Sequence, residues 1–102
     1  MLTDFEVIPD ETVAVEDKII LCRDRKRYVF TRVTEEAWEE IGVDFGLYYG
    51  DAARKKAVDL AQKNLELFSR LINELYAARR EPPRVITITA QDIKKIASEF
   101  RK

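Results

Sequence analysis

The segment 51–80 constrains the fold more than any other part of the chain. It contains neither Gly nor Pro, and its apolar residues recur three and four positions apart, which is the spacing of one face of a helix. The seam with this spacing consists of Val58, Ala61, Leu65, Phe68, Ile72 and Leu75. A second apolar face beside the seam consists of Leu60, Leu67 and Leu71. We therefore predict one long helix over 51–80.

The length of this helix predicts self-association. A helix of about 30 residues is a rod of about 45 Å. A compact chain of this size has a radius of gyration of about 13 Å and is only about 33 Å across. The helix should therefore extend beyond its own domain, with one apolar face covering a sheet and the other facing a second copy. Our first hypothesis is a non-catalytic assembly protein, a homo-oligomer and most simply a dimer, with the six seam residues as the interface.

The segments before the helix predict an antiparallel β-meander. Alternating apolar residues indicate strands near 5–8, 12–16, 19–23 and 27–33, which gives three or four strands. Neither short turn among the later strands contains Gly or Asn, so we expect loops looser than tight hairpin turns.

Local signals place the remaining elements. Thr34 is a typical N-cap and Gly42 a typical stop, which predicts a short helix over 34–41. The glycine-containing segment 42–50 is predicted to be a loop or a broken helix. The β-branched segment 84–89 predicts a strand that joins the sheet, and Thr89 with Asp92 resembles a capping box that begins a C-terminal helix over 90–101. The expected fold class is α+β, with a single domain over 1–102.

Composition sets the broad class of protein. Hydrophobic residues make up 46% and charged residues 36% of the chain, and no apolar run is long enough to cross a membrane. The N-terminus has neither the basic nor the apolar region of an export signal, so we expect a cytoplasmic protein without a membrane partner. A high charged content with few amides is typical of proteins from thermophiles.

Known catalytic and metal-binding patterns are missing. The chain has no His, no paired cysteines and no phosphate-binding glycine motif, so we predict no enzyme activity, no cofactor and no metal site. Cys22 lies in an apolar run and is expected to be a buried, inert thiol. A remote alternative is a metal-dependent enzyme that uses the acidic cluster Glu35, Glu36, Glu39 and Glu40, although a solvated helix face explains the same spacing.

The segment 23–32 suggests a second function. Basic and aromatic residues alternate around its predicted hairpin: Arg23, Arg25, Lys26, Arg27, Tyr28, Phe30 and Arg32. Single-stranded nucleic acid is bound by this combination, with cations for the phosphates and rings for the bases. Alternatively, the two rings belong to the core beneath the long helix, or the hairpin tip enters a duplex groove. The second hypothesis is therefore a small dimeric regulator that binds nucleic acid.

The charge pattern leaves the partner of this hairpin open. The net charge is −1, yet 1–17 and 34–51 contain acids without a single base, and 18–33 is dominated by Arg and Lys. A basic block can face a polyanion, or it can face the acidic block of a neighbouring subunit. The sequence shows where the charges lie but does not say whether the basic block binds a polyanion or a neighbouring subunit.

Overall fold

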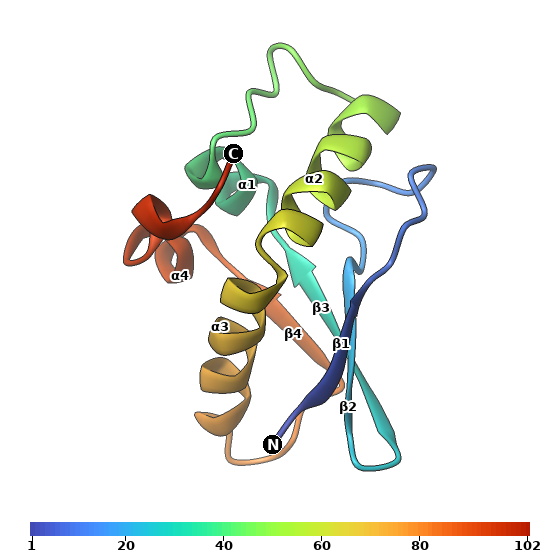
Figure 1. The fold of residues 1–102 in the computed structure, drawn as a ribbon, viewed down its shortest axis with the longest axis vertical. Coiled ribbons are helices and arrows are strands. Elements are labelled where there is room, and N and C mark those ends of the chain that lie inside the picture. The colour runs from blue at the N-terminus through green and yellow to red at the C-terminus, as the bar shows by residue number, and fades with distance from the viewer.

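The computed structural model describes residues 1–102, which form a four-stranded sheet with helices and confirm the α+β class. The order of elements is β1 (Thr3–Val7), β2 (Ile20–Asp24), β3 (Arg27–Val33), α1 (Glu35–Ile41), α2 (Asp51–Lys63), α3 (Leu65–Ala77), β4 (Val85–Ile88), α4 (Ala90–Lys94) and a 3₁₀ turn, η1 (Ala97–Glu99) (Figure 1). None of the helices is both long enough and apolar enough to cross a lipid bilayer.

The sheet has the strand order β1-β2-β3-β4. β1, β2 and β3 are antiparallel, which confirms the predicted meander with three strands, and β4 lies parallel to β3. The segment 12–16 is not a strand, because it belongs to a loop between β1 and β2. The turn between β2 and β3 is also tighter than predicted: Asp24 pairs with Arg27, and only two residues connect them.

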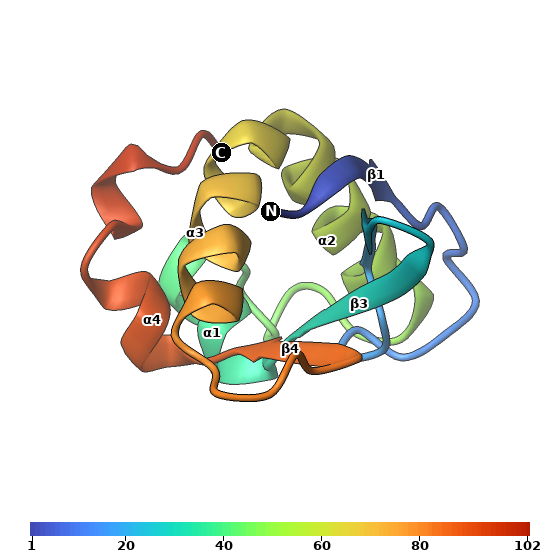
Figure 2. The same ribbon diagram turned by 90° about the horizontal axis from the view of Figure 1, so that it is seen from below.

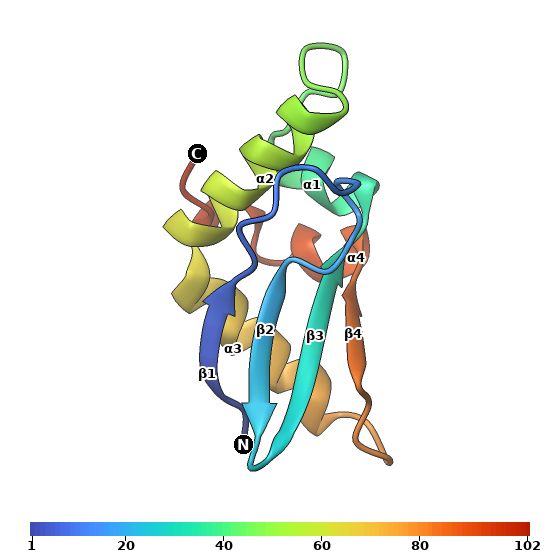
Figure 3. The same cartoon turned by 90° about the vertical axis from the view of Figure 1, so that its right-hand side faces the viewer.

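The helices cover one face of the sheet and leave the other face open. In Figure 3 the strands lie in front and the helices behind them. Alternation along the strands agrees with this arrangement, since Val29, Thr31 and Val33 of β3 are buried while Tyr28 and Arg32 are exposed. The core lies between the sheet and the helices, where the rings of Trp38 and Phe68 meet edge to face at 5.9 Å.

The predicted long helix is broken at Asn64. Its backbone angles, φ −119° and ψ 23°, are not helical, and α3 leaves α2 in a new direction (Figure 1). The side-chain amide donates to the carbonyl oxygens of Leu60 (2.9 Å) and Arg101 (2.7 Å), and the Arg101 N–H donates back to Asn64 Oδ1 at 2.7 Å. The chain therefore has two shorter helices in place of one rod of about 45 Å, and the longest dimension of the molecule is 39 Å.

The helical seam is used within the chain itself. Ala61, Phe68 and Ile72 have no exposed surface, and Val58 is 5% exposed. Leu65 and Leu75 are partly buried against the same core. The sequence spacing correctly marked a buried face, but most of this face packs in the chain's own core, and only Leu65 and Leu75 keep partial exposure. The seam therefore has little surface left for a second copy, and both the interface and the oligomeric state stay predictions.

Local capping signals hold at the ends of the shorter helices. Thr34 Oγ1 accepts a hydrogen bond from the Ala37 N–H (3.1 Å), and Gly42, at φ +117°, ends α1, so that 42–50 is a loop. Thr89 and Asp92 form the predicted capping box of α4, which packs against α1 (Figure 2). The C-terminal helix is shorter than predicted and ends at Lys94, because the chain turns to bring Phe100 against Phe68, with ring centroids 5.1 Å apart.

Candidate nucleic-acid interface

The face of the sheet opposite the helices, which we call the uncovered face, collects the outward side chains of three strands. They are Leu21 and Arg23 of β2, Tyr28, Phe30 and Arg32 of β3, and Val85 and Thr87 of β4. Strand register places Leu21 and Val85 on either side of Phe30, and Arg23 beside Tyr28. Tyr28 is 56% exposed and Phe30 is half-buried. Both rings therefore lie on the side away from the helices and not in the core beneath them.

Cations surround the two rings. Lys18 Nζ lies 4.7 Å from the centroid of the Phe30 ring, and Arg23 Cζ lies 5.9 Å from that of Tyr28. An open hollow of about 580 Å³ lies at this position, and its lining consists of Lys18, Lys26, Arg27, Tyr28, Phe30, Arg84 and Val85. Lys18, Lys26 and Arg84 form no ion pair, so their charges are available to a ligand.

The predicted basic residues have different roles. Arg23 lies 3.8 Å from Asp4, and Arg32 Nε donates to the main-chain oxygen of Glu16 at 3.0 Å. The Arg27 guanidinium donates to the Pro82 carbonyl oxygen at 2.6 Å, which joins the hairpin to the segment before β4. Arg25 lies at the exposed hairpin tip with a φ of +59°, in the left-handed region that a residue with a Cβ rarely adopts.

Contacts with α3 and with the segment before β4 fix the turn end of the hairpin. The Tyr76 hydroxyl of α3 donates to Asp24 Oδ2 at 2.5 Å. This hydrogen bond, assisted by burial and by the negative charge of Asp24, raises the pKa of Tyr76 above its usual value of 10.0. Together with the Arg27–Pro82 contact, it holds the ends of β2 and β3 in place. The rings of the uncovered face are therefore carried by a fixed hairpin.

A buried arginine holds the loop that carries Lys18. Arg54 of α2 has no exposed surface, and its guanidinium donates to the carbonyl oxygens of Asp10 (2.9 Å), Asp17 (3.0 Å) and Lys18 (2.7 Å). Burial lowers the pKa of Arg54, and the nearby carboxylates of Asp17 and Asp10 partly oppose this shift. The guanidinium thus satisfies three carbonyls of a loop without regular structure and fixes the main chain beside Phe30.

Lys18, Arg54 and Arg84 were not among the site residues predicted from the sequence. Arg54 could have been noticed, because it lies between Ala53 and Ala57 on the buried side of a helix. Lys18 and Arg84 carried no local signal, since they meet only through the parallel pairing of β4 with β3 and the course of the loop before β2.

The acidic cluster does not assemble a metal site. Its four glutamates are exposed on α1, and nowhere in the chain do three or more His, Cys, Asp or Glu side chains group in a way that could hold a metal ion. Cys22 is fully buried, and this burial raises the pKa of its thiol to about 11, so the reactive thiolate is scarce at neutral pH.

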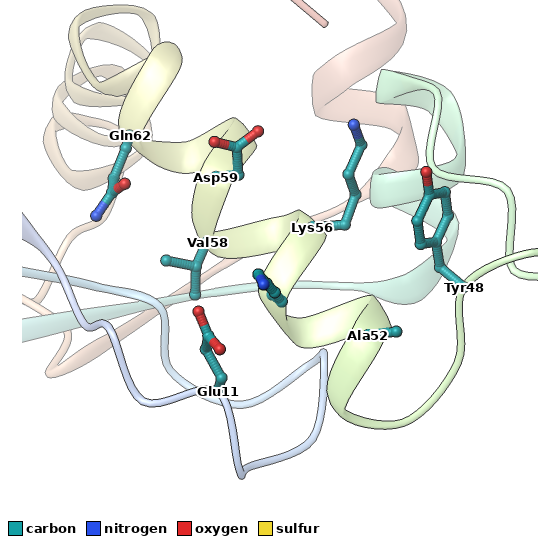
Figure 4. A pocket seen from close by; sticks show the side chains of 8 residues that line it. Glu11, Tyr48, Ala52, Lys56, Val58, Asp59 and Gln62 are labelled. Atoms are coloured by element: carbon teal, nitrogen blue, oxygen red, sulfur yellow. The ribbon is translucent and has the colours of Figure 1, made fainter.

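A second hollow, of about 370 Å³, lies along α2 (Figure 4). Its charged side chains have opposite signs, Glu11 and Asp59 against Lys55 and Lys56, and Lys56 Nζ lies 5.8 Å from the ring of Tyr48. Because these charges can compensate one another, the hollow favours no class of charged ligand. The uncovered face differs in that its hollow is lined by cations alone among charged groups.

No protein-family profile matches the chain, and neither a curated protein nor a solved structure matches it. What the uncovered face can bind therefore follows from its own chemistry. That chemistry consists of two outward aromatic rings, unpaired cations beside them and a sheet whose strands are held from behind.

Proposed function

We propose that the protein is a non-catalytic binding protein for single-stranded nucleic acid, with the uncovered face as its binding surface. The single observation that carries the proposal is the outward placement of Tyr28 and Phe30 within a hollow whose charged residues are all basic. Rings of this kind stack on unpaired bases, and the cations beside them neutralise the phosphates. A duplex hides the faces of its bases, so stacking favours single strands.

The distribution of charge supports the same orientation. The acids of α1, Glu35, Glu36, Glu39 and Glu40, lie on the helical side of the molecule. The helices α2 to α4 add Lys and Arg to these acids, so the helical side is mixed in sign. By contrast, the hollow with Lys18 and Arg84 has only basic residues among its charged groups and is where a polyanion is attracted, although the net charge is only −1. Affinity should accordingly be moderate and should fall with salt.

The other two hypotheses have less support. Assembly through the helical seam would require residues that are enclosed in the core, such as Phe68 and Ile72. A metal-dependent reaction would require ligands that the acidic cluster does not bring together.

Fluorescence anisotropy with labelled 15-nucleotide DNA and RNA, single-stranded and duplex, tests the proposal at low and moderate salt. We expect single strands to bind more tightly than duplexes. Tyr28→Ala should weaken binding by about 1–3 kcal/mol, the value of one stacked base. Tyr28→Phe keeps the ring and should retain binding, which separates stacking from a role of the hydroxyl group.

Charge is tested by a matched pair of variants. Replacing Lys18, Lys26 and Arg84 by Gln should reduce the salt dependence of log K by about 2 if all three contact phosphates of a single strand. The control variant replaces Lys94, Lys95 and Lys102 by Gln. These lysines are exposed residues of the C-terminal segment, and their replacement makes the same change in net charge. Equal losses in the two variants would mean that net charge alone drives binding, and an absence of single-strand binding at low salt would end the proposal.

A further inference from the structure

β4 has a free edge. The strand pairs only with β3, and in Figure 3 no other segment runs alongside it on the opposite side. The Phe30 N–H donates to the Arg84 carbonyl oxygen (2.9 Å) and the Thr34 N–H to that of Ile88 (3.1 Å), so these carbonyls face β3. By alternation, the main-chain N–H and C=O groups of Val85 and Thr87 point away from β3, in the plane of the sheet, and have no partner strand.

β4 is short, at four residues, but this edge otherwise lacks the features that usually prevent pairing. Between Val85 and Ile88 there is no charge, no Pro and no bulge, and all four residues are β-branched. The opposite edge is different: β1 is irregular between Thr3 and Glu6 and contains acidic residues, and Asp4 has a φ of +57°. Natural edge strands are commonly protected by irregularities and charged residues such as those of β1. An edge without them is a template for another strand.

We propose that a second copy of this chain pairs with the edge of β4, antiparallel, about a two-fold axis at Ile86. This register places Val85 of each copy opposite Thr87 of the other, and each pair exchanges both of its main-chain hydrogen bonds. Both cross-strand pairs are β-branched, and Ile86 lies beside its own counterpart on the helical side.

Charge complementarity argues for this occupant rather than for an unrelated strand. Arg84, an exposed and unpaired cation, precedes β4, and the capping box with Asp92 follows it. Antiparallel pairing brings the basic end of each strand next to the acidic end of the other. The same patch serves both copies, as a closed two-fold dimer requires.

The dimer would also enlarge the proposed binding surface, a consequence that rests on the proposed function. A two-fold axis perpendicular to the sheet keeps both uncovered faces on the same side. The two β3 strands are then three strand spacings apart, about 14 Å. Two clusters of rings and cations would thus lie within reach of one single strand of moderate length.

Charged substitutions at positions 85 and 87 test the pairing and its register. Sedimentation equilibrium from 5 to 200 µM protein measures the dimer dissociation constant. We expect wild-type protein to dimerise within this range. The double variant Val85→Asp/Thr87→Asp places like charges opposite each other twice and should weaken the dimer at least about tenfold. The variant Val85→Lys/Thr87→Asp pairs opposite charges in the same register and should retain it.

Both positions are exposed in a single copy, and far-UV circular dichroism checks that each variant folds. A wild type that is monomeric at 200 µM overturns the inference, as does equal dimerisation of the two variants. Binding of 6- and 30-nucleotide single strands separates this inference from the proposed function. A dimer that binds neither strand removes only the proposed function, whereas a monomer that binds both removes only the dimer.

Discussion

Replacing Asn64 by Ala should destabilise the protein, even though Ala is the better helix former. The substitution removes three hydrogen bonds, to the Leu60 carbonyl and to both main-chain groups of Arg101. At about 1 kcal/mol each these bonds contribute about 3 kcal/mol, and the gain in helix propensity returns about 0.5 kcal/mol. We expect a loss of about 2.5 kcal/mol, which corresponds to a fall in Tm of about 10–20 °C for a domain of this size.

Urea and thermal unfolding followed by far-UV circular dichroism measure this loss. Gln62→Ala, which removes an exposed amide from the same helix, is the matched control and should stay within about 0.5 kcal/mol of wild type. A chain that ends at Phe100 lacks the main-chain partner of Asn64, so in that background Asn64→Ala should cost little. The explanation fails if the two changes are additive, or if Asn64→Ala raises the Tm.

Four further residues give testable outcomes. Arg54→Met should lower the free energy of unfolding by about 3 kcal/mol in urea, because three buried carbonyls lose their donors, and Arg54→Lys should recover only part of it. Arg25→Asn should raise the free energy of unfolding by about 0.5 kcal/mol, and with it the Tm, since Asn tolerates a positive φ better than Arg. The Cys22 thiol should resist a thiol reagent at pH 8 in the folded protein and react once urea unfolds it. The raised pKa of Tyr76 adds stability that is complete below pH 10 and is lost as the pH rises through the folded-state pKa, so Tyr76→Phe should flatten this part of the stability profile.

Local chemistry in the sequence was sufficient for the ends of the short helices. The cap at Thr34, the stop at Gly42 and the capping box at Thr89 depend on residues within a few positions of each other. The break at Asn64 could not be seen in the same way, because its partner is the main chain of Arg101, 37 residues away. Periodicity marks the buried face of a segment, but it does not say whether that segment is straight.

The candidate interface shows the same limit at the level of the sheet. Alternation along 27–33 separated Tyr28 and Phe30 from Val29 and placed both rings on one face. Which face the helices would cover depended on how the chain crosses between β3 and β4, and no single segment encodes that. The basic lining was underestimated for the same reason, because it includes a residue of β4's N-terminal flank.

The uncovered face is also hard to explain as a merely solvated surface. Polar residues such as Thr, Lys and Glu are suited to a sheet face in water. Burial of an exposed aromatic ring is favourable by roughly 1.5–3 kcal/mol, so an exposed Tyr28 gives up part of this stabilisation. Within the chain the Arg23 guanidinium approaches this ring, which stays 56% exposed, and α3 lies on the opposite face of the same sheet (Figure 3). The cations beside the rings make a hydrophobic protein partner a poor match, since their desolvation would be unfavourable. A ligand that offers flat π-systems together with negative charge satisfies both groups at once, and single-stranded nucleic acid combines the two in every nucleotide.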